Sequence, residues 1–228
     1  MKRIAFFGGS FDPPHRGHLA IAKTAADRFA LDEVLFAPVA SQPLKQRETT
    51  TSFLHRYAMT VLASQEDTRF VPSLLDAPAQ TPNYTIDTLE RLRSSLPTEA
   101  HIFILLGADS WLEISRWHDA ARLLSLTDWI VAARPGFSLA AAERALPPQI
   151  ESLKIPASPE QCLQLSHANG GTTNVFFLPE IREEPSATKL REKFDAGQAN
   201  PEWLPETVRE YIRKTGLYRD NAVAGRIR

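Results

Sequence analysis

The chain has 228 residues, 43% of them hydrophobic and 23% charged, which excludes an intrinsically disordered or collagen-like protein. Its 26 Lys and Arg nearly balance its 27 Asp and Glu, so it lacks the positive field of a dedicated nucleic-acid-binding protein. A single cysteine, Cys162, cannot form an internal disulfide, which favours a reducing compartment. The apolar run that ends at Gly8 is too short for a secretory signal, and no apolar stretch approaches the roughly 20 residues that cross a bilayer. We therefore expect a cytoplasmic protein with no membrane or nucleic-acid partner.

Short apolar segments alternate with segments of helical period through the first half of the chain. The predicted strands cover residues 4–7, 34–38, 70–71, 102–106 and 129–133, and helices are predicted over 19–29, 52–62 and 85–96. The helix that Ser52 caps is predicted to carry Leu54, Ala58, Val61 and Leu62 on one face. Apolar strands separated by helices are typical of a parallel sheet buried on both faces. The sequence thus predicts an α/β fold: a doubly wound, Rossmann-like parallel sheet with helices on both faces.

The pattern is less regular after residue 134. A helix is predicted over 138–146, followed by an irregular insertion over 147–173 with a turn at 169–171. A strand over 174–178 precedes two closing helices that form a C-terminal helical segment. The first begins near Ser186 and ends by Gly197, and the second has Pro205 in its first turn and Gly216 just past its end. We expect one domain over 1–218 and a tail over 219–228.

Residues 8–18, GGSFDPPHRGH, lie where the first predicted strand leads into the first helix. Ligands of parallel sheets bind beyond the carboxyl ends of the strands, and Gly8 and Gly9 let the backbone approach a ligand closely. His15 and His18 are three residues apart at the amino end of the helix, where N–H groups and the helix dipole favour anions. Imidazoles there can donate to phosphate oxygens and stabilise developing charge. The segment therefore predicts a phosphate-binding loop.

Two other interpretations of this loop remain open from the residues alone. The first is a Gly- and Pro-containing turn with two surface histidines. The second is a zinc pair, although the spacing lacks a third ligand and the Glu of a His-Glu-x-x-His motif. The segment matches neither the dinucleotide-binding glycine fingerprint nor the Walker loop.

A second candidate segment is residues 186–191, SATKLR. Ser186 and Thr188 could cap the amino end of a helix, while Arg191 could reach the same anion from within that helix. The alternative is a capped basic helix without a ligand.

Together these two segments resemble the nucleotidyltransferases related to class I aminoacyl-tRNA synthetases. Residues 9–18 match their Gly-x-Phe-x-Pro-x-His-x-Gly-His signature, and residues 186–191 resemble Ser-Ser-Thr-x-x-Arg, with Ala187 at the middle serine and Pro185 where Ile is usual. The resemblance implies that His15, His18 and Arg191 are catalytic. It implies a set of ATP-binding residues that comprises Gly8, Gly9, Ser10, Phe11, His15, His18, Gly107, Asp109, Ser186, Thr188 and Arg191.

Further segments narrow the resemblance to the bacterial nicotinate-nucleotide adenylyltransferase family. They are GADS at 107–110, NYTIDTL at 83–89, SRWH at 115–118, PLK at 43–45 and RPG at 134–136. Near the end of the chain they include LP at 204–205, YI at 211–212 and GLY at 216–218. The resemblance covers most of the chain except 138–173 and the tail. It implies transfer of the adenylyl group of ATP to nicotinate mononucleotide, giving nicotinate adenine dinucleotide and pyrophosphate in NAD biosynthesis.

The same resemblance assigns the residues that bind the mononucleotide. Lys45 and Arg134 would neutralise its 5′-phosphate, Trp117 would stack on the nicotinate ring, and amides around Tyr84 and Thr85 would hold the nicotinate carboxylate. Each has an ordinary alternative: the two cations could be solvated, and the tryptophan could serve packing. Asp109, implied to lie against the nucleotide ribose, could equally be a helix cap.

The implied chemistry needs no activated nucleophile, because the phosphate of the acceptor can itself attack the α-phosphorus of ATP in line. The protein then positions the reactants and stabilises charge. Without a carboxylate cluster for an all-protein site, we expect no metal site and Mg²⁺ carried by the ATP phosphates. Alternatives are another acceptor, such as nicotinamide mononucleotide or pantetheine phosphate, and a nucleotide-binding regulator. A tRNA synthetase fragment is disfavoured because no Lys-Met-Ser-Lys-Ser element is present. A homo-oligomer is compatible with the sequence.

Overall fold

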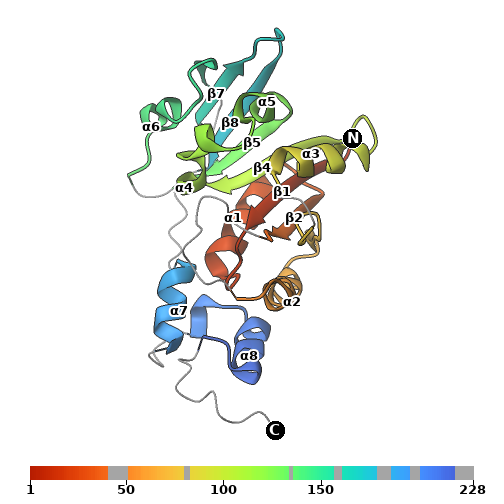
Figure 1. Cartoon of the computed structure of the whole chain (residues 1–228), viewed down its shortest axis with the longest axis vertical. Helices are drawn as coiled ribbons and strands as arrows, with labels where there is room; N and C mark the ends of the chain where they lie inside the picture. The colour runs from red at the N-terminus through yellow and green to blue at the C-terminus, as the bar shows by residue number, and fades with distance from the viewer. Residues whose placement is uncertain are drawn as a thin grey trace.

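An eight-stranded sheet forms the centre of the molecule, with strands in the order β3-β2-β1-β4-β5-β8-β7-β6 (Figure 1). The computed structural model describes residues 1–40, 51–79, 83–133, 136–156, 161–178, 186–195 and 201–218. The strands are β1 (Arg3–Gly9), β2 (Glu33–Pro38), β3 (Phe70–Pro72), β4 (His101–Gly107), β5 (Asp128–Ala132), β6 (Glu151–Pro156), β7 (Gln161–Ser166) and β8 (Thr172–Leu178). The strands from β3 to β8 in this order pair in parallel. The doubly wound α/β prediction is therefore confirmed.

Helices cover both faces of the sheet. They are α1 (Arg16–Arg28), α2 (Phe53–Ser64), α3 (Thr85–Ser94), α4 (Ala108–Trp111), α5 (Ala120–Ser125), α6 (Leu139–Arg144), α7 (Ala187–Asp195) and α8 (Glu206–Thr215), with 3-10 turns η1 (Ile114–Arg116) and η2 (Pro201–Trp203). One buried cluster packs α1, α2, α7 and α8 against the sheet. A second buried cluster packs α3, α4, α5 and α6 against it. Figure 1 shows α7 and α8 at one end of the molecule, beside α1 and α2.

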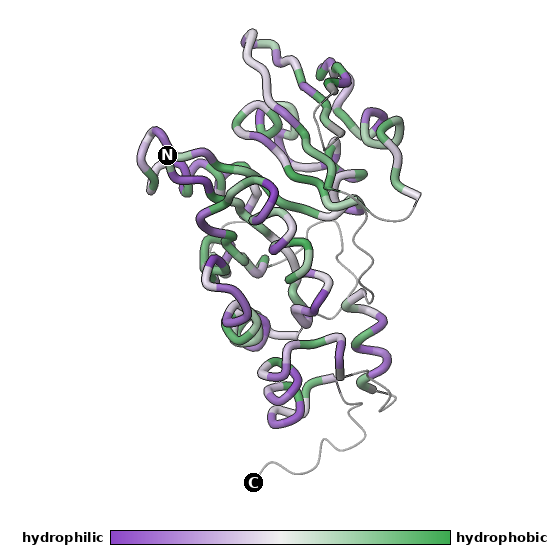
Figure 2. The backbone as a smooth tube through the Cα atoms, turned by 180° about the vertical axis from the view of Figure 1, so that it is seen from behind, coloured by the Kyte–Doolittle hydropathy of each residue, from purple (hydrophilic) through white to green (hydrophobic). Residues whose placement is uncertain are grey.

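The continuous apolar strands follow from burial on two faces. In β1, Ile4 and Phe6 belong to the cluster under α3, whereas Ala5 and Phe7 belong to the cluster under α1. All four side chains are less than 5% exposed. Figure 2 shows the central strands as mostly hydrophobic, while the helices mix hydrophilic and hydrophobic segments. A strand with apolar neighbours on both sides gains nothing from alternation, so its sequence is continuously apolar.

The segment predicted to be irregular contains two strands. β6 and β7 pair antiparallel with each other, and β7 pairs antiparallel with β8, so the sheet is not parallel throughout. Because β6 is an edge strand with exposed positions such as Leu153, its composition does not show the apolar run of a central strand. The turn predicted at 169–171 is present, with Gly170 at φ +78° and the Gly171 amide donating to Asn169 Oδ1 at 2.9 Å.

The buried face of α2 differs from the predicted one. Leu54 is 77% exposed, and the buried positions are instead Arg56, Met59, Thr60, Ala63 and Ser64. The apolar pattern was misleading here because an arginine occupies the centre of the buried face. The two ends of α8 lie close to the predicted residues: Pro205 immediately precedes the helix, and Gly216 ends it at φ +71°. The short helices α4 and α5 were not predicted.

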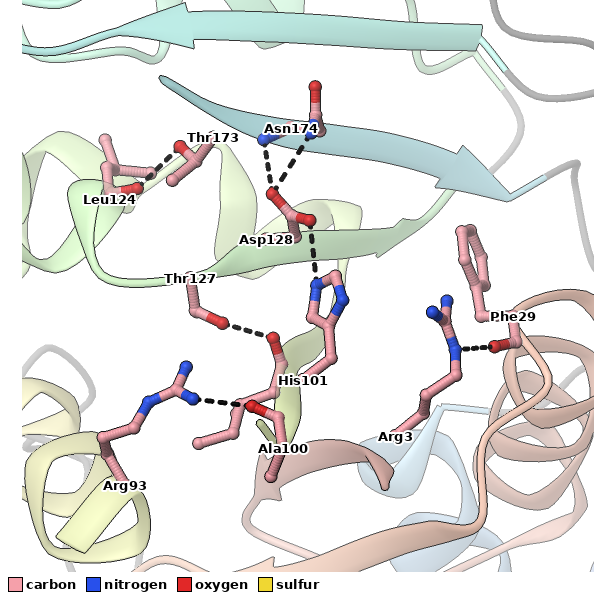
Figure 3. Close-up of polar contacts among 11 residues, drawn as sticks. Arg3, Phe29, Arg93, Ala100, His101, Leu124, Thr127, Asp128, Thr173 and Asn174 are labelled. Atoms are coloured by element: carbon pink, nitrogen blue, oxygen red, sulfur yellow. Dashed lines mark hydrogen bonds and ion pairs between the residues drawn. The ribbon is translucent and has the colours of Figure 1, made fainter. Parts of the chain in front are cut away.

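Polar contacts join the amino ends of β4, β5 and β8 (Figure 3). His101 Nε2 lies 3.0 Å from Asp128 Oδ2, and Asp128 Oδ1 accepts a hydrogen bond from the backbone N–H of Asn174 at 2.7 Å. Because parallel strands have their carboxyl ends at the opposite edge, this cluster anchors strands at the edge away from the expected ligand site. Among the helices that the structure describes, none has the length and apolar character needed to span a membrane.

Candidate active site

A cavity of about 610 Å³ opens at the carboxyl ends of β1 and β4. These neighbouring strands form the topological switch point, since the chain continues from β1 towards β2 on one side and from β4 towards β5 on the other. Ligands of doubly wound sheets bind at this point. The lining residues are Phe6, Gly8, Gly9, Val39, Asp76, Asn83, Tyr84, Thr85, Ile104, Leu105, Leu106, Asp109, Ser110, Glu113, Arg116, Trp117, His118 and Leu123.

The two glycines at the end of β1 place no side chain on the backbone that lines the cavity. A β-carbon on Gly8 would lie 3.2 Å from the Phe6 ring, and one on Gly9 would lie 3.2 Å from the Phe11 ring. Both distances are tighter than ordinary side-chain contacts, so the packing beneath the cavity favours glycine at both positions. A ligand can therefore approach the backbone itself here.

Aromatic side chains gather at another part of the cavity. Trp117 is half-buried and meets the buried Trp129 ring edge-on, with centroids 6.4 Å apart. Tyr84 stacks on His118 with centroids 4.0 Å apart and planes 18° apart. Thr85 begins α3 directly after Tyr84. The structure thus brings Tyr84, Thr85 and Trp117 together in one cavity, together with His118, the residue after Trp117.

Asp76 is a buried carboxyl group in the cavity wall that was not among the residues predicted from the sequence. The residue is 5% exposed and follows β3 in a loop. Its Oδ1 accepts a hydrogen bond from Thr88 Oγ1 at 2.5 Å. Burial raises the pKa of this carboxyl above its usual range, an effect that the Thr88 hydrogen bond and the Arg91 charge oppose. No motif surrounds Asp76, so only the folded structure could place it at the site.

The predicted phosphate loop fixes the ring of His18. The backbone N–H of His15 donates to Nδ1 of His18 at 3.2 Å, and the two imidazoles stack with centroids 3.7 Å apart. Because Nδ1 accepts, the neutral His18 ring carries its proton on Nε2 and presents a donor there. Phe11 packs edge-on against this ring with its own side chain fully buried. The whole residue is buried, so in this structure Phe11 supports the ring of His18 and exposes no surface to a ligand.

The chain's late segments meet the phosphate loop at Asp12. Arg191 in α7 donates from Nη1 to the Asp12 carbonyl at 2.8 Å. The Asp12 carboxylate, which is fully buried, accepts from the Tyr218 hydroxyl at 2.5 Å and from the Thr51 amide at 3.0 Å. Burial, followed by the charge of Asp12, raises the pKa of Tyr218, so its phenol remains the donor. Residues from both ends of the polypeptide thus converge on one loop.

The side chain of Arg56, in α2, connects the loops that follow β1 and β2 through hydrogen bonds. Its side chain donates to the carbonyls of Ser10, Val39 and Thr51, each at 2.8–2.9 Å. The residue is 2% exposed, and desolvation lowers the pKa of its guanidinium while the nearby Asp12 raises it. A buried arginine is tolerated because its donors are satisfied by carbonyls and a carboxylate is close. Neither Arg56 nor Asp12 was predicted to have this role.

Ser186 caps the amino end of α7, as predicted, whereas Thr188, the other predicted cap, lies within the helix. Ser186 Oγ accepts a hydrogen bond from the Lys189 amide at 3.3 Å, and Thr188 Oγ1 lies 3.4 Å from Arg191 Nη2. Thr188 and Arg191 therefore lie side by side on the helix that contacts the phosphate loop.

The predicted site residues fall into two neighbouring sets. Gly8, Gly9, Tyr84, Thr85, Asp109 and Trp117 line the cavity. Ser10, Phe11, His15 and His18 belong to the adjoining loop, which Arg191 contacts from α7, the helix that carries Thr188 and that Ser186 caps. Gly107 ends β4, two residues before Asp109. Lys45 and Arg134 lie outside the described residues. Within the described ranges, no group of three or more His, Cys, Asp or Glu side chains could hold a metal ion.

Comparisons with known proteins agree with this architecture. A family model described as cytidylyltransferase-like matches residues 6–193. The chain is 35% identical to a "probable nicotinate-nucleotide adenylyltransferase" of Thermus thermophilus over 95% of this chain and 100% of that protein. It is 32% identical to the nicotinate-nucleotide adenylyltransferase of Bacillus subtilis over 96% of this chain and 99% of that protein. The solved Plasmodium falciparum nicotinic acid mononucleotide adenylyltransferase complexed with NaAD matches with a TM-score of 0.68 at 17% identity, covering 96% of this chain and 98% of that chain, and so shares the fold. The chain therefore belongs to the cytidylyltransferase-like family and, within it, to the nicotinate-nucleotide adenylyltransferases.

Proposed function

We propose that this chain transfers the adenylyl group of ATP to nicotinate mononucleotide, releasing pyrophosphate and forming nicotinate adenine dinucleotide. The observation that carries the proposal is the continuity between the aromatic cavity and the phosphate loop. Gly8 and Gly9 line the cavity, and the same segment runs on to His15 and His18. A pyridine mononucleotide has an aromatic ring at one end and a phosphate at the other, which suits such a site. The names of the relatives support the same acceptor.

In this proposal the protein positions two phosphates and stabilises charge. The acceptor phosphate attacks the α-phosphorus of ATP, the bond from that phosphorus to the β-phosphate oxygen breaks, and pyrophosphate leaves with the electron pair. The Nε2–H of His18 and the guanidinium of Arg191 are the donors proposed to stabilise the charge that develops on the phosphate oxygens. Mg²⁺ enters as part of the substrate, bound to ATP, and neutralises the phosphates. His15, Ser10, Ser186 and Thr188 are proposed to complete the ATP site.

Further roles are proposed for residues at and near the cavity and for two cations that lie outside the described residues. Tyr84 and Thr85 are proposed to hold the nicotinate carboxylate through backbone amides at the start of α3, and Asp109 and Gly107 to contact the nucleotide ribose. Lys45 and Arg134 are proposed to pair with the 5′-phosphate of the mononucleotide.

The test of this function is pyrophosphate release from ATP and Mg²⁺ with a panel of acceptors. Nicotinate mononucleotide, nicotinamide mononucleotide and pantetheine phosphate are offered separately, and the product is identified by mass spectrometry. We expect nicotinate adenine dinucleotide as the main product and no release when the metal is chelated. Product from pantetheine phosphate alone would overturn the proposal.

Replacement of Trp117 tests the ring end of the cavity. Trp117→Ala removes the flat face proposed for the pyridine, and stacking contributes about 1 kcal/mol beyond area burial, so we expect KM for the mononucleotide to rise about 5- to 10-fold. KM for ATP should change little, and Trp117→Phe should recover part of the loss. A large fall in melting temperature with unchanged KM would show instead that Trp117 serves packing.

A further inference from the structure

The cavity wall contains a carboxyl group for which the proposed reaction has no use. Asp76 is held in place on two sides: its carbonyl accepts from the Ala40 amide at 3.0 Å, and its Oδ1 accepts from Thr88 Oγ1 at 2.5 Å. Arg91 in turn donates to Thr88 Oγ1 at 2.9 Å and to the Leu75 carbonyl at 3.0 Å. This network fixes the orientation of the carboxyl plane before any ligand arrives.

The second oxygen of Asp76 lies next to Gly8, another residue that lines the cavity. Oδ2 lies 3.9 Å from the position that a β-carbon on Gly8 would take. Among the residues that the structure describes, none donates a hydrogen bond to Oδ2, and this oxygen is not one of the fully buried unpartnered atoms. A ligand in the cavity can therefore reach this oxygen, and a donor on the ligand would replace the water that solvates it.

The position of Asp76 along the cavity indicates which part of the ligand it meets. In the proposed function the pyridine ring lies by Trp117 and Tyr84, and the phosphate lies towards the loop that follows Gly9. Asp76 adjoins Gly8, which precedes that loop. The ribose is the part of a mononucleotide that joins the ring to the phosphate, and its hydroxyl groups are hydrogen-bond donors. A carboxylate would repel the phosphate, so a hydroxyl is the chemical match.

We infer that Asp76 binds a ribose hydroxyl of the pyridine mononucleotide through Oδ2 and so selects acceptors that carry this hydroxyl. The inference rests on the proposed function, because it assigns one more contact in the same substrate site. The hydroxyl donates and the carboxylate accepts, with Thr88 and Arg91 as positioning residues. The burial that raises the pKa of Asp76 is consistent with a group whose full complement of hydrogen bonds forms only with substrate.

The experiment pairs changes in the protein with changes in the substrate. Nicotinate mononucleotide and its 2′-deoxy and 3′-deoxy ribose forms are compared by kcat/KM with wild-type protein and with Asp76→Ala. Wild-type protein should lose about 10- to 100-fold with the form that lacks the contacted hydroxyl, the range for a hydrogen bond to a charged group. Asp76→Ala should lose a similar factor with the parent substrate and should use that parent and that deoxy form equally well.

Two further variants keep the test decisive. Asp76→Asn preserves the shape of the side chain and serves if the alanine variant does not fold; its discrimination should fall to a few-fold because the charge is lost. Asp87→Asn removes a carboxylate from the first turn of α3 that does not line the cavity, and it should discriminate as the wild type does.

The outcomes separate the inference from the function on which it rests. If wild-type protein makes no dinucleotide from the parent mononucleotide, the transfer proposal and the ribose contact both fail. If wild-type protein is active but uses all three substrates equally, or if Asp76→Ala keeps the wild-type discrimination, the ribose contact alone is overturned. A uniform loss by Asp76→Ala on all three substrates, with discrimination unchanged, would give Asp76 a structural role only.

Discussion

At the scale of single residues, His18 combines a structural and a chemical contribution that a designed pair of variants can separate. Its Nδ1 accepts from the His15 amide, while its Nε2 carries the proton. Asparagine can retain an acceptor near Nδ1 but has no counterpart of Nε2. We therefore expect His18→Asn to lower kcat by roughly 10²-fold or more, as loss of a transition-state donor does, with little change in melting temperature.

His18→Ala, which loses both contributions, should show the same fall in kcat and a lower melting temperature. Turnover at the wild-type rate by folded His18→Asn protein would refute the donor role.

Candidate site residues could be named from the sequence where they lie in a motif, but not where they stand alone. His18, Arg191 and Trp117 lie in segments that resemble motifs of a known family, and this resemblance made them candidates. Asp76 and Arg56 act through partners that are distant in the chain, such as Thr88 for the first and Ser10 for the second. A single buried charge in a helix has no periodic signal, because its function depends on which carbonyls the fold brings within reach.

At the scale of elements, the turn between α2 and β3 is tied to α1 by charge. Arg69 donates to Asp67 Oδ2 and to Asp27 Oδ1, each at 2.7 Å. The hydrogen bonds from Arg69 lower the pKa of Asp67 from 3.8 to about 2. Because the folded-state pKa lies below the unfolded value, this carboxylate contributes stability above about pH 4, and the contribution is lost as the pH falls towards 2.

We expect Asp67→Asn to lower the free energy of unfolding by about 1–2 kcal/mol at pH 7, after allowance for partial solvent screening, with a smaller difference at pH 2.5. Urea unfolding at both values measures it. Glu206→Gln, which removes an exposed carboxylate paired with Arg209, is the matched control and should show no measurable loss. A constant difference across this pH range would contradict the assignment.

Elements buried on both faces were the predictable part of the fold. β1, β4 and β5 appear as continuous apolar runs, and their predicted limits differ from the observed ones by at most two residues at each end. β6 was missed because an edge strand needs little apolar surface, and α5 was missed because a helix of six residues has too few turns to establish a period. The order of strands in the sheet follows from long-range packing, which no local pattern contains.

At the scale of the whole molecule, Tyr218 connects the end of the last described turn to the phosphate loop near the start of the chain. Tyr218→Phe removes the hydroxyl that donates to Asp12 but keeps the ring beside Phe194. We expect a loss of about 1.5–3 kcal/mol in stability, the range for a hydrogen bond to a charged group. We also expect kcat to fall about 3- to 10-fold, with KM for the mononucleotide unchanged because Tyr218 does not line the cavity.

Tyr211→Phe is the control for a purely structural effect. The Tyr211 hydroxyl lies 2.8 Å from His55 Nδ1, a contact between α8 and α2 outside the loop. This variant should lose stability while kcat stays at the wild-type value. If the two variants reduce kcat equally, Tyr218 has no special role in positioning the loop.

The hydrogen bond between Tyr218 and Asp12 spans 206 positions of the sequence, so its two partners are synthesised at very different times. Synthesis proceeds from the amino terminus, so a nascent chain contains the glycine-lined cavity wall long before it contains the tyrosine. The phosphate loop can therefore form this hydrogen bond only after Tyr218, which follows α8, has left the ribosome. A protease that removed α8 and Tyr218 from the finished protein would break this bond and leave the loop to its contacts with Thr51, Arg56 and Arg191.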